Sequence, residues 1–136
     1  MGKILYTSCF SKVKSYVLGK EPVQVVNTKT GPREIDFTKV VSIAGRAPKW
    51  YGTRRTYKKL APKLKTFLKY KLDKNSIAYT ASYWMEVLNK LDPDKVYDVL
   101  GDKMIMLCWE PDGEFCHRQL IRKWFQQHTD IQVIEI

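Results

Sequence analysis

The stretch MLCWEPDGEFCHRQL, residues 106–120, contains two cysteines, a histidine, an arginine and three acids. An apolar run precedes this stretch and an amphipathic run follows it. We therefore expect Cys116, His117 and Arg118 in the first turn of a helix, where free amide hydrogens and the helix dipole favour negative charge. A Cys116 thiolate would be stabilised there, and Arg118 is a suitable fork for a carboxylate or phosphate. Glu110 follows the preceding strand and is a candidate general base, or a partner for the arginine.

Three interpretations of these residues stay open. A zinc site needs four ligands, but Cys108, Cys116 and His117 follow neither a CxxC nor an HxxxH pattern, and Cys9 or His128 would have to complete the set. We therefore expect no metal and no cofactor. Cys108 by itself is typical of a small buried strand residue. For the rest of the stretch, the density of polar groups favours a functional site, with catalytic candidates Glu110, Cys116 and His117. Geometry argues against His117 as the base for Cys116, because adjacent helical side chains point about 100° apart.

The composition indicates one soluble folded domain over residues 1–136. The apolar fraction is 44% and the charged fraction 28%, which excludes wholesale disorder. Apolar runs are far shorter than the roughly 18 residues that a membrane span needs, and the first ten residues lack the pattern of a secretory signal. The chain has three cysteines, and this odd number argues against a disulfide framework. We therefore expect a cytoplasmic protein without membrane association.

The formal net charge of +10 is concentrated in one segment. Residues 46–74 hold eleven basic residues and one acid, whereas the rest of the chain holds 13 of each sign. Such a segment attracts polyanions, since phosphates bind Lys and Arg with release of counterions. The aromatics of the same segment suit stacking on bases, and they are Trp50, Tyr51, Tyr57, Phe67 and Tyr70. A solvated, solubilising face is the simpler alternative. The predicted nucleic-acid contacts are Arg54, Arg55, Lys58 and Lys59.

The residue patterns predict an α/β fold: a single three-layer domain with a mostly parallel four- or five-stranded sheet and flanking helices. We expect strands at residues 3–8, 23–27, 38–45, 103–109 and 131–136, and helices at residues 10–20, 62–72, 76–91, 93–100 and 115–128. Residues 28–34 and 110–114 are predicted turns. "VVSIA" and "MIMLC" should be neighbouring central strands, buried on both faces. Helix 76–91 should turn its apolar face inward through Ile77, Trp84, Leu88 and Leu91.

Several segments resemble the family known as domain of unknown function 488. The main likeness is "LCWE…FCHR", an apolar strand ending in Leu-Cys-x-Glu and a helix opened by Cys-His-Arg. "YTSCF", "SIAGRAPKWY", "YKKLAPK" and "YTASYWMEVLNKLDP" look like further segments of its shorter, basic branch. The turn at residues 109–113 and the insert "TKTGPRE" depart from that pattern. The resemblance implies one pocket at the strand ends, surrounded by Ser8, Arg46, Glu110, Cys116, His117 and Arg118.

Two tyrosines and two functions complete the expectations. Tyr79 and Tyr83 lie one helical turn apart, so they could line the same pocket or merely pack against the body of the protein.

In one interpretation the protein is an enzyme acting on a nucleotide or nucleic-acid component, with Arg46 and Arg118 anchoring an anion. In the other it is a module that binds such a ligand without chemistry. A weaker third interpretation has the basic segment docking on an acidic protein.

Overall fold

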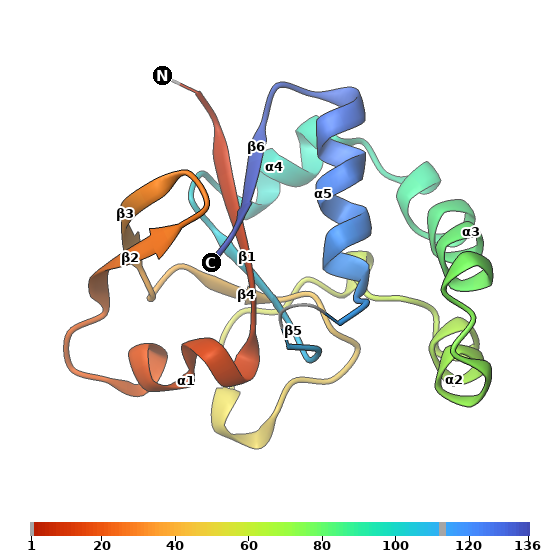
Figure 1. Ribbon diagram of the computed structural model, residues 1–136, viewed down its shortest axis with the longest axis horizontal. Helices are drawn as coiled ribbons and strands as arrows, with labels where there is room; N and C mark the ends of the chain where they lie inside the picture. Colours follow the sequence, from red (N-terminus) through yellow and green to blue (C-terminus); the bar gives the residue numbers. More distant parts are fainter. Residues whose placement is uncertain (1, 112–113) are drawn as a thin grey trace.

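The core of the protein is a parallel four-stranded sheet (Figure 1). The computed structural model describes residues 2–111 and 114–136. Strands β1 (Ile4–Cys9), β4 (Val40–Ser42), β5 (Ile105–Cys108) and β6 (Gln132–Glu135) are arranged in the order β4-β5-β1-β6. Each neighbouring pair is parallel. The predicted α/β fold with a mostly parallel sheet is confirmed.

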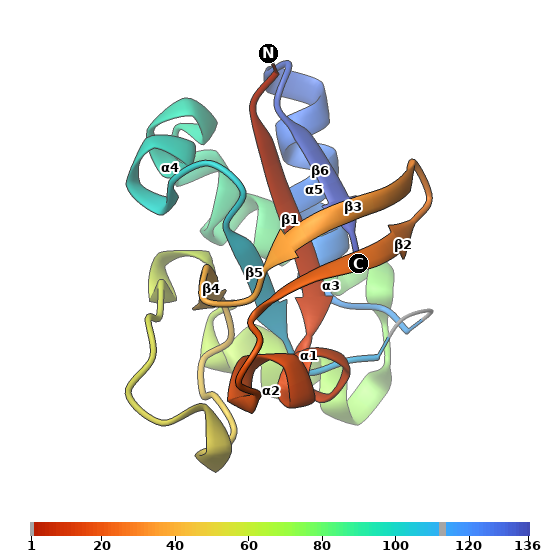
Figure 2. The same ribbon diagram turned by 90° about the vertical axis from the view of Figure 1, so that its left-hand side faces the viewer.

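Two layers cover the sheet. Helix α1 (Phe10–Leu18) and a hairpin of β2 (Val23–Thr28) and β3 (Gly31–Asp36) lie on one face (Figure 2). Helices α3 (Ser76–Glu86), α4 (Pro93–Leu100) and α5 (His117–His128) lie on the other face. Helix α2 (Leu64–Asp73) packs against α3 and lies below it in the view of Figure 1. Side chains that alternate along β5 supply both cores, since Met106 faces one layer while Ile105 and Leu107 face the other.

The hairpin corrects one prediction. Residues 28–34 were expected to form a turn, but Gly31–Asp36 is a strand that pairs antiparallel with β2. The turn is shorter, and the Thr28 hydroxyl donates to the Gly31 carbonyl at 2.7 Å across it. Gly31 has φ +101°, a conformation that glycine adopts without strain. From there on burial alternates with period two and Ile35 is buried, a pattern hidden among the turn-forming residues that precede it.

The strand β4 is shorter and more peripheral than expected. It pairs with β5 and is buried, as predicted, but it occupies the edge of the sheet rather than its centre. The chain covers this edge itself. Ser42 N donates to the Arg55 carbonyl at 3.0 Å, and Tyr57 N donates to the Ser42 carbonyl at 2.8 Å. The loop therefore satisfies the edge hydrogen bonds that a fifth strand would otherwise take.

Helix α4 occupies the predicted residues 93–100, whereas the predicted helix 76–91 ends at Glu86 and turns a different face inward. Asp92 Oδ1 accepts from Asp94 N at the start of α4, and Gly101 ends that helix. Helix α3 buries Tyr79 and Tyr83 instead of Ile77, which is 83% exposed. The reason lies in α2, which packs on the tyrosine side of α3 through Tyr70, with 5.3 Å between the Tyr70 and Tyr79 ring centroids.

Short 3₁₀ turns connect β4 to α2, and they span Lys49–Tyr51 and Lys58–Leu60. A third 3₁₀ turn, Leu88–Lys90, follows α3. Along α5 Leu120, Ile121, Trp124 and Phe125 are all buried and form the face that packs on the core. Among the described residues, no helix has the length and apolar character needed to cross a membrane.

Candidate functional site

A cavity of about 580 Å³ opens at the carboxyl ends of β4 and β5. Two walls enclose it. The strand-end wall consists of residues 44–46 after β4, residues 108–110 at the end of β5, and residues 115–117 at the start of α5. The α2 wall consists of lining side chains from residues 62–70, with Tyr79 of α3 beside them. This is the edge at which ligands bind in parallel α/β sheets, as the sequence predicted.

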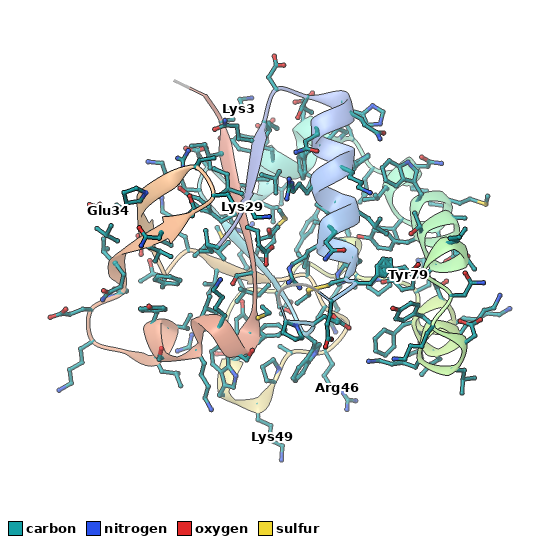
Figure 3. All side chains as sticks on the ribbon, viewed as in Figure 1. Lys3, Lys29, Glu34, Arg46, Lys49 and Tyr79 are labelled. Atoms are coloured by element: carbon teal, nitrogen blue, oxygen red, sulfur yellow. A yellow bond between two sulfur atoms is a disulfide. The ribbon has the colours of Figure 1, made fainter. Side chains whose placement is uncertain are left out.

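The α2 wall and its neighbours are aromatic. Phe67 and Tyr70 from α2, Tyr79 from α3 and Phe115 before α5 all line the cavity. The Tyr70, Tyr79 and Phe115 rings meet edge to face, with centroids 5.2–5.4 Å apart. Figure 3 shows Tyr79 reaching from α3 toward the start of α5. Such a lining suits a flat, apolar group held by stacking or edge contacts.

The strand-end wall is held together by an indole. Trp109 Nε1 donates to the Arg46 carbonyl at 2.6 Å, which ties the loop after β4 to the end of β5. The Arg46 side chain is exposed and borders the cavity (Figure 3). The turn that departs from the family pattern at Trp109 is therefore part of the pocket itself. The central residues of that turn, Asp112 and Gly113, lie outside the described part of the chain.

Cys116 and His117 form a close pair. Cys116 is the N-cap of α5 with extended φ and ψ, so its side chain does not follow helical geometry. Its Sγ lies 3.6 Å from His117 Nδ1. The 100° offset expected between adjacent helical residues therefore does not apply, because Cys116 precedes the helix. The structure brings together two groups that helical geometry alone would separate.

The buried environment of His117 fixes its protonation and its tautomer. Its Nε2 lies 2.9 Å from the Ile43 carbonyl. A carbonyl oxygen can only accept, so Nε2 carries the hydrogen and Nδ1 presents a lone pair toward Cys116 Sγ. Burial, together with the Arg118 charge, lowers the pKa of His117 to about 4, although the Ile43 hydrogen bond opposes this shift. His117 is therefore neutral at pH 7, and its unprotonated Nδ1 faces Cys116.

Arg118 faces inward and does not line the cavity. Its Nε lies 3.0 and 3.1 Å from the two Glu135 carboxylate oxygens, and its Nη1 donates to the Glu110 carbonyl at 2.6 Å and to Cys108 Sγ at 2.9 Å. Only 1% of its side chain is exposed. Thr7 supports the pair by donating its hydroxyl to Glu135 Oε1. The arginine fork is thus bound to protein acceptors and holds the end of β5 to β6.

The two cysteines of the stretch meet. The Sγ atoms of Cys108 and Cys116 are in contact, with their Cα atoms 7.6 Å apart, while Cys9 keeps a buried free thiol. The odd cysteine count argued against a disulfide framework, and it did not predict this contact. Counting cysteines fails here because pairing depends on the approach of β5 to the start of α5. Cys108 is buried as predicted, yet it also lines the cavity.

Sulfur and nitrogen donors also gather at this point. The Sγ atoms of Cys108 and Cys116 and a ring nitrogen of His117 lie within 4.8 Å of one another. A thiophilic metal ion such as zinc prefers these donors. In the disulfide form both sulfurs are bonded to each other, so the set is available to a metal only after reduction. The predicted absence of metal stays a prediction.

Other predicted site residues take different places. Glu110 lines the cavity, and burial together with the Glu110 charge raises the pKa of Tyr79 above its ordinary value. Tyr83 lies beneath the cavity, where its hydroxyl donates to the Leu60 carbonyl at 2.6 Å and its ring lies 5.5 Å from that of His117. Ser8 is fully buried at the end of β1, and its hydroxyl donates to the Ile136 carbonyl. Neither Ser8 nor Tyr83 reaches the cavity lining.

The basic segment divides into bound and free side chains. Arg54 donates to the Tyr51 carbonyl at 2.9 Å, and Arg55 donates to the Val99 and Leu100 carbonyls at the end of α4. Lys58 and Lys59 are exposed, as are the lysines of α2. The aromatics of the segment divide as well. Phe67 and Tyr70 line the cavity, whereas Trp50 and Tyr51 pack edge to face with Phe10 beside α1.

Two contributors escaped sequence reasoning. Phe115 is a cavity wall, and its signal was an aromatic residue directly before the predicted helix start. Glu135 anchors Arg118 from the last strand. Its signal was an acid inside an otherwise apolar strand, a position where acids are rare unless paired.

The fold and the site define a class: a parallel α/β protein with an aromatic cavity at its strand ends and a Cys-His pair at the following helix. Family models identify it further. The model described as the active DUF488-N3 subclade, DUF488-N3a, matches residues 11–129. This chain therefore belongs to the DUF488 family, as its Cys-His-Arg signature predicted. No match was found among curated proteins or among solved structures.

Proposed function

We propose that this chain is an enzyme acting on a nucleotide or nucleic-acid component, with Glu110, Cys116 and His117 as its reacting groups. One observation carries the proposal: these three side chains, from the end of a strand and the start of a helix, line one aromatic cavity. The matching subclade is described as active, which supports an enzyme over a pure binding module. Because a reduced Cys116 is required, the proposal places the chain in the cytosol.

The Cys-His pair supplies the proposed chemistry. In the reduced protein His117 Nδ1 accepts the Cys116 proton across the 3.6 Å that separates them, and the Ile43 carbonyl holds the ring in the tautomer that this transfer needs. A nucleophile, its base and an orienting third group form the usual arrangement of thiol catalysis. The N-terminus of α5 adds its dipole to stabilise the thiolate. Glu110 is then free to move a second proton on the ligand.

Charge and aromatic surface are separated in a way that suits a base with its phosphates. Among the lining residues that the structure describes, Arg46 carries the permanent positive charge, while most of the wall is apolar. The lysines lie outside. A second hollow of about 240 Å³ between α2 and α3 shares Tyr70 and Tyr79 with the cavity, and its charged lining residues are Lys65, Lys69, Asp73 and Glu86. A base in the cavity would therefore leave its phosphates near Arg46, the cation of the cavity lining.

A reactivity experiment tests the enzyme. Reduced protein is treated with limiting iodoacetamide, and the labelled cysteine is identified by peptide mass spectrometry. We expect Cys116 to react faster than Cys9, with a rate that falls in His117→Gln because the neutral base is lost, while the rate at Cys108 stays the same. Cys9, buried at the end of β1, is the internal control. Equal, slow labelling of every cysteine would contradict the proposal.

A binding experiment separates the second candidate, a module without chemistry. Fluorescently labelled single-stranded oligonucleotides and the four mononucleotides are titrated against the protein and against Tyr79→Ala. Loss of binding in Tyr79→Ala places the ligand in the cavity. Glu110→Gln then distinguishes the two candidates. If the protein is an enzyme, the variant still binds the oligonucleotide but no longer converts it. If the protein is a binding module, the variant loses affinity, and mass spectrometry detects no product with the wild type or with the variant.

A further inference from the structure

We propose that Cys108 is a redox partner of Cys116, and that low-molecular-weight disulfides oxidise this pair and thereby inactivate the cavity. This inference rests on the proposed function, because it concerns the cysteine assigned there as the nucleophile. The observation behind it is the contact of their two Sγ atoms, at the end of β5 and the start of α5. Both cysteines line the cavity and are otherwise buried, with 1% of Cys108 and 3% of Cys116 exposed, so an oxidant reaches them through the cavity.

The surroundings of Cys108 differ from those of a passive core cysteine. Arg118 Nη1 donates to Cys108 Sγ at 2.9 Å, and the guanidinium is held in place by the Glu135 carboxylate and the Glu110 carbonyl. A fixed cation beside sulfur favours its thiolate form. Arg118 faces away from the cavity and does not bind the ligand, but this contact gives it a role at Cys108. Cys108 is therefore the thiol that attacks first.

The surroundings of Cys116 suit the second step. His117 Nδ1 lies 3.6 Å from its sulfur and can take its proton. Cys9 lacks comparable partners: its sulfur lies 3.5 Å from the Ser11 hydroxyl, and it is not a lining residue of the cavity. The three cysteines thus have three different environments, and two of them are matched to sequential steps of thiol–disulfide exchange.

The exchange balances as follows. The Cys108 thiolate attacks one sulfur of a small disulfide such as oxidised glutathione, forming a mixed disulfide and releasing one thiolate. Cys116 gives its proton to His117 and attacks the Cys108 sulfur, which forms the Cys108–Cys116 bond and breaks the mixed disulfide. The second small thiolate leaves and takes up the proton. Two protein thiols are oxidised and one small disulfide is reduced to two thiols, so no further oxidant is needed.

Oxidation has a direct consequence at the site. Cys116 in a disulfide has no thiolate to offer, so the proposed nucleophile disappears. A reductant of the same chemical class, a small thiol, reverses the exchange by the same steps. The pair therefore couples the proposed activity to the thiol–disulfide balance around the protein.

The test uses the full chain and a readout that needs no substrate. Reduced protein is incubated with oxidised glutathione, free thiols are alkylated, and intact mass and peptide maps are recorded. We expect a Cys108–Cys116 disulfide, one alkylated thiol at Cys9 instead of three, and recovery of all three after dithiothreitol. Cys9→Ser is the matched control and should form the same disulfide. Three reactive thiols after oxidation, or a disulfide that includes Cys9, would overturn the proposal.

Variants that lack one cysteine test the order of the steps. Cys116→Ser should accumulate glutathione on Cys108, because the thiol that resolves the mixed disulfide is missing. Cys108→Ser should form no disulfide within the chain, because Cys116 has lost its partner. Absence of the adduct in Cys116→Ser would overturn the attack by Cys108. A purified protein whose thiols hold a stoichiometric metal and resist oxidised glutathione would overturn the inference as a whole, whatever the fate of the proposed enzyme.

Discussion

The two walls of the cavity are built in different ways. The strand-end wall is tied down by hydrogen bonds, among them Trp109 to the Arg46 carbonyl and His117 to the Ile43 carbonyl. The α2 wall is a lysine-rich helix whose Leu64, Leu68 and Leu72 are at least half exposed. Groups that must hold an exact geometry sit on the first wall, and rings that can meet a ligand by stacking sit on the second. This contrast suggests that chemistry and recognition are separable by mutation.

The largest expected effect lies behind the strand-end wall. Arg118→Met leaves Glu135 with an unpaired, mostly buried carboxylate, and breaking such a pair from one side typically costs about 3–5 kcal/mol. We expect this loss in the free energy of unfolding, measured by urea denaturation at pH 7. Lys123→Met, on the exposed face of the same helix, should change it by less than about 0.5 kcal/mol. Equal stability of the two variants would show that the arginine does not hold this wall.

Acid should weaken the same wall through His117. Its pKa is lowered to about 4 in the folded protein against an ordinary value of 6.5, so between these values the unfolded chain binds the additional proton. The contribution of His117 is therefore complete above pH 6.5 and is lost as the pH falls toward 4. The shift corresponds to about 3 kcal/mol. Urea denaturation from pH 7.5 to 4 measures it.

His117→Gln serves as the reference for this pH series. Asp36 and Asp102 also have a lowered pKa, because hydrogen bonds stabilise their carboxylates, and they too reduce stability in acid. Their contribution is present in both proteins and cancels in the difference. Parallel pH curves for the wild type and His117→Gln would show that the imidazole is not held neutral by its surroundings.

A smaller effect is expected where the basic segment supports the fold. Arg55 donates to the last carbonyls of α4, where a cation also complements the helix dipole. Arg55→Gln should lower the free energy of unfolding by about 1 kcal/mol. Lys59→Gln, four residues later and exposed, is the matched control with no expected change in stability. If both substitutions cost the same, the helix-capping role is excluded.

The smallest effect on stability, and a distinct effect on binding, is expected on the side of the free lysines. The double variant Lys58→Gln, Lys59→Gln should unfold within about 0.5 kcal/mol of the wild type. Its affinity for a single-stranded oligonucleotide should depend less on salt, with the slope lowered by about one unit for each lost phosphate contact. Titrations across a salt series measure this slope. An unchanged slope would remove these two lysines from the proposed interface.

Local patterns were sufficient for much of the fold and part of the site. The apolar run before Cys108 and the helical stripe after it predicted β5 and α5, and these two elements bring Glu110, Cys116 and His117 together with little help from the rest of the chain. For Tyr79 and Tyr83 the sequence left cavity lining and packing open, and Tyr79 lines the cavity whereas Tyr83 packs beneath it. These successes share a cause, because each depends on contacts within a strand, a turn or a helix.

The errors involve contacts between residues that lie far apart along the sequence. Arg118 was expected to face the ligand, but its orientation is set by Glu135, which is seventeen residues later on β6. The contact of Cys108 with Cys116 depends on how closely β5 approaches α5, and a count of cysteines contains no such information. The edge position of β4 depends on strand order, and strand order is decided by the path of the whole chain. Ile77 was misjudged because α2 packs on the other side of α3.

The bond between Trp109 and the Arg46 carbonyl has an optical consequence. The indole is 49% exposed, yet its ring nitrogen is hydrogen-bonded, and it stands in the wall of the cavity. Indole emission shifts in wavelength and intensity when its hydrogen bond or its solvent exposure changes. The protein thus carries its own fluorophore at the rim of the cavity. With Trp50, Trp84 and Trp124 replaced by phenylalanine, emission from Trp109 would report occupancy of the cavity in real time and without a label.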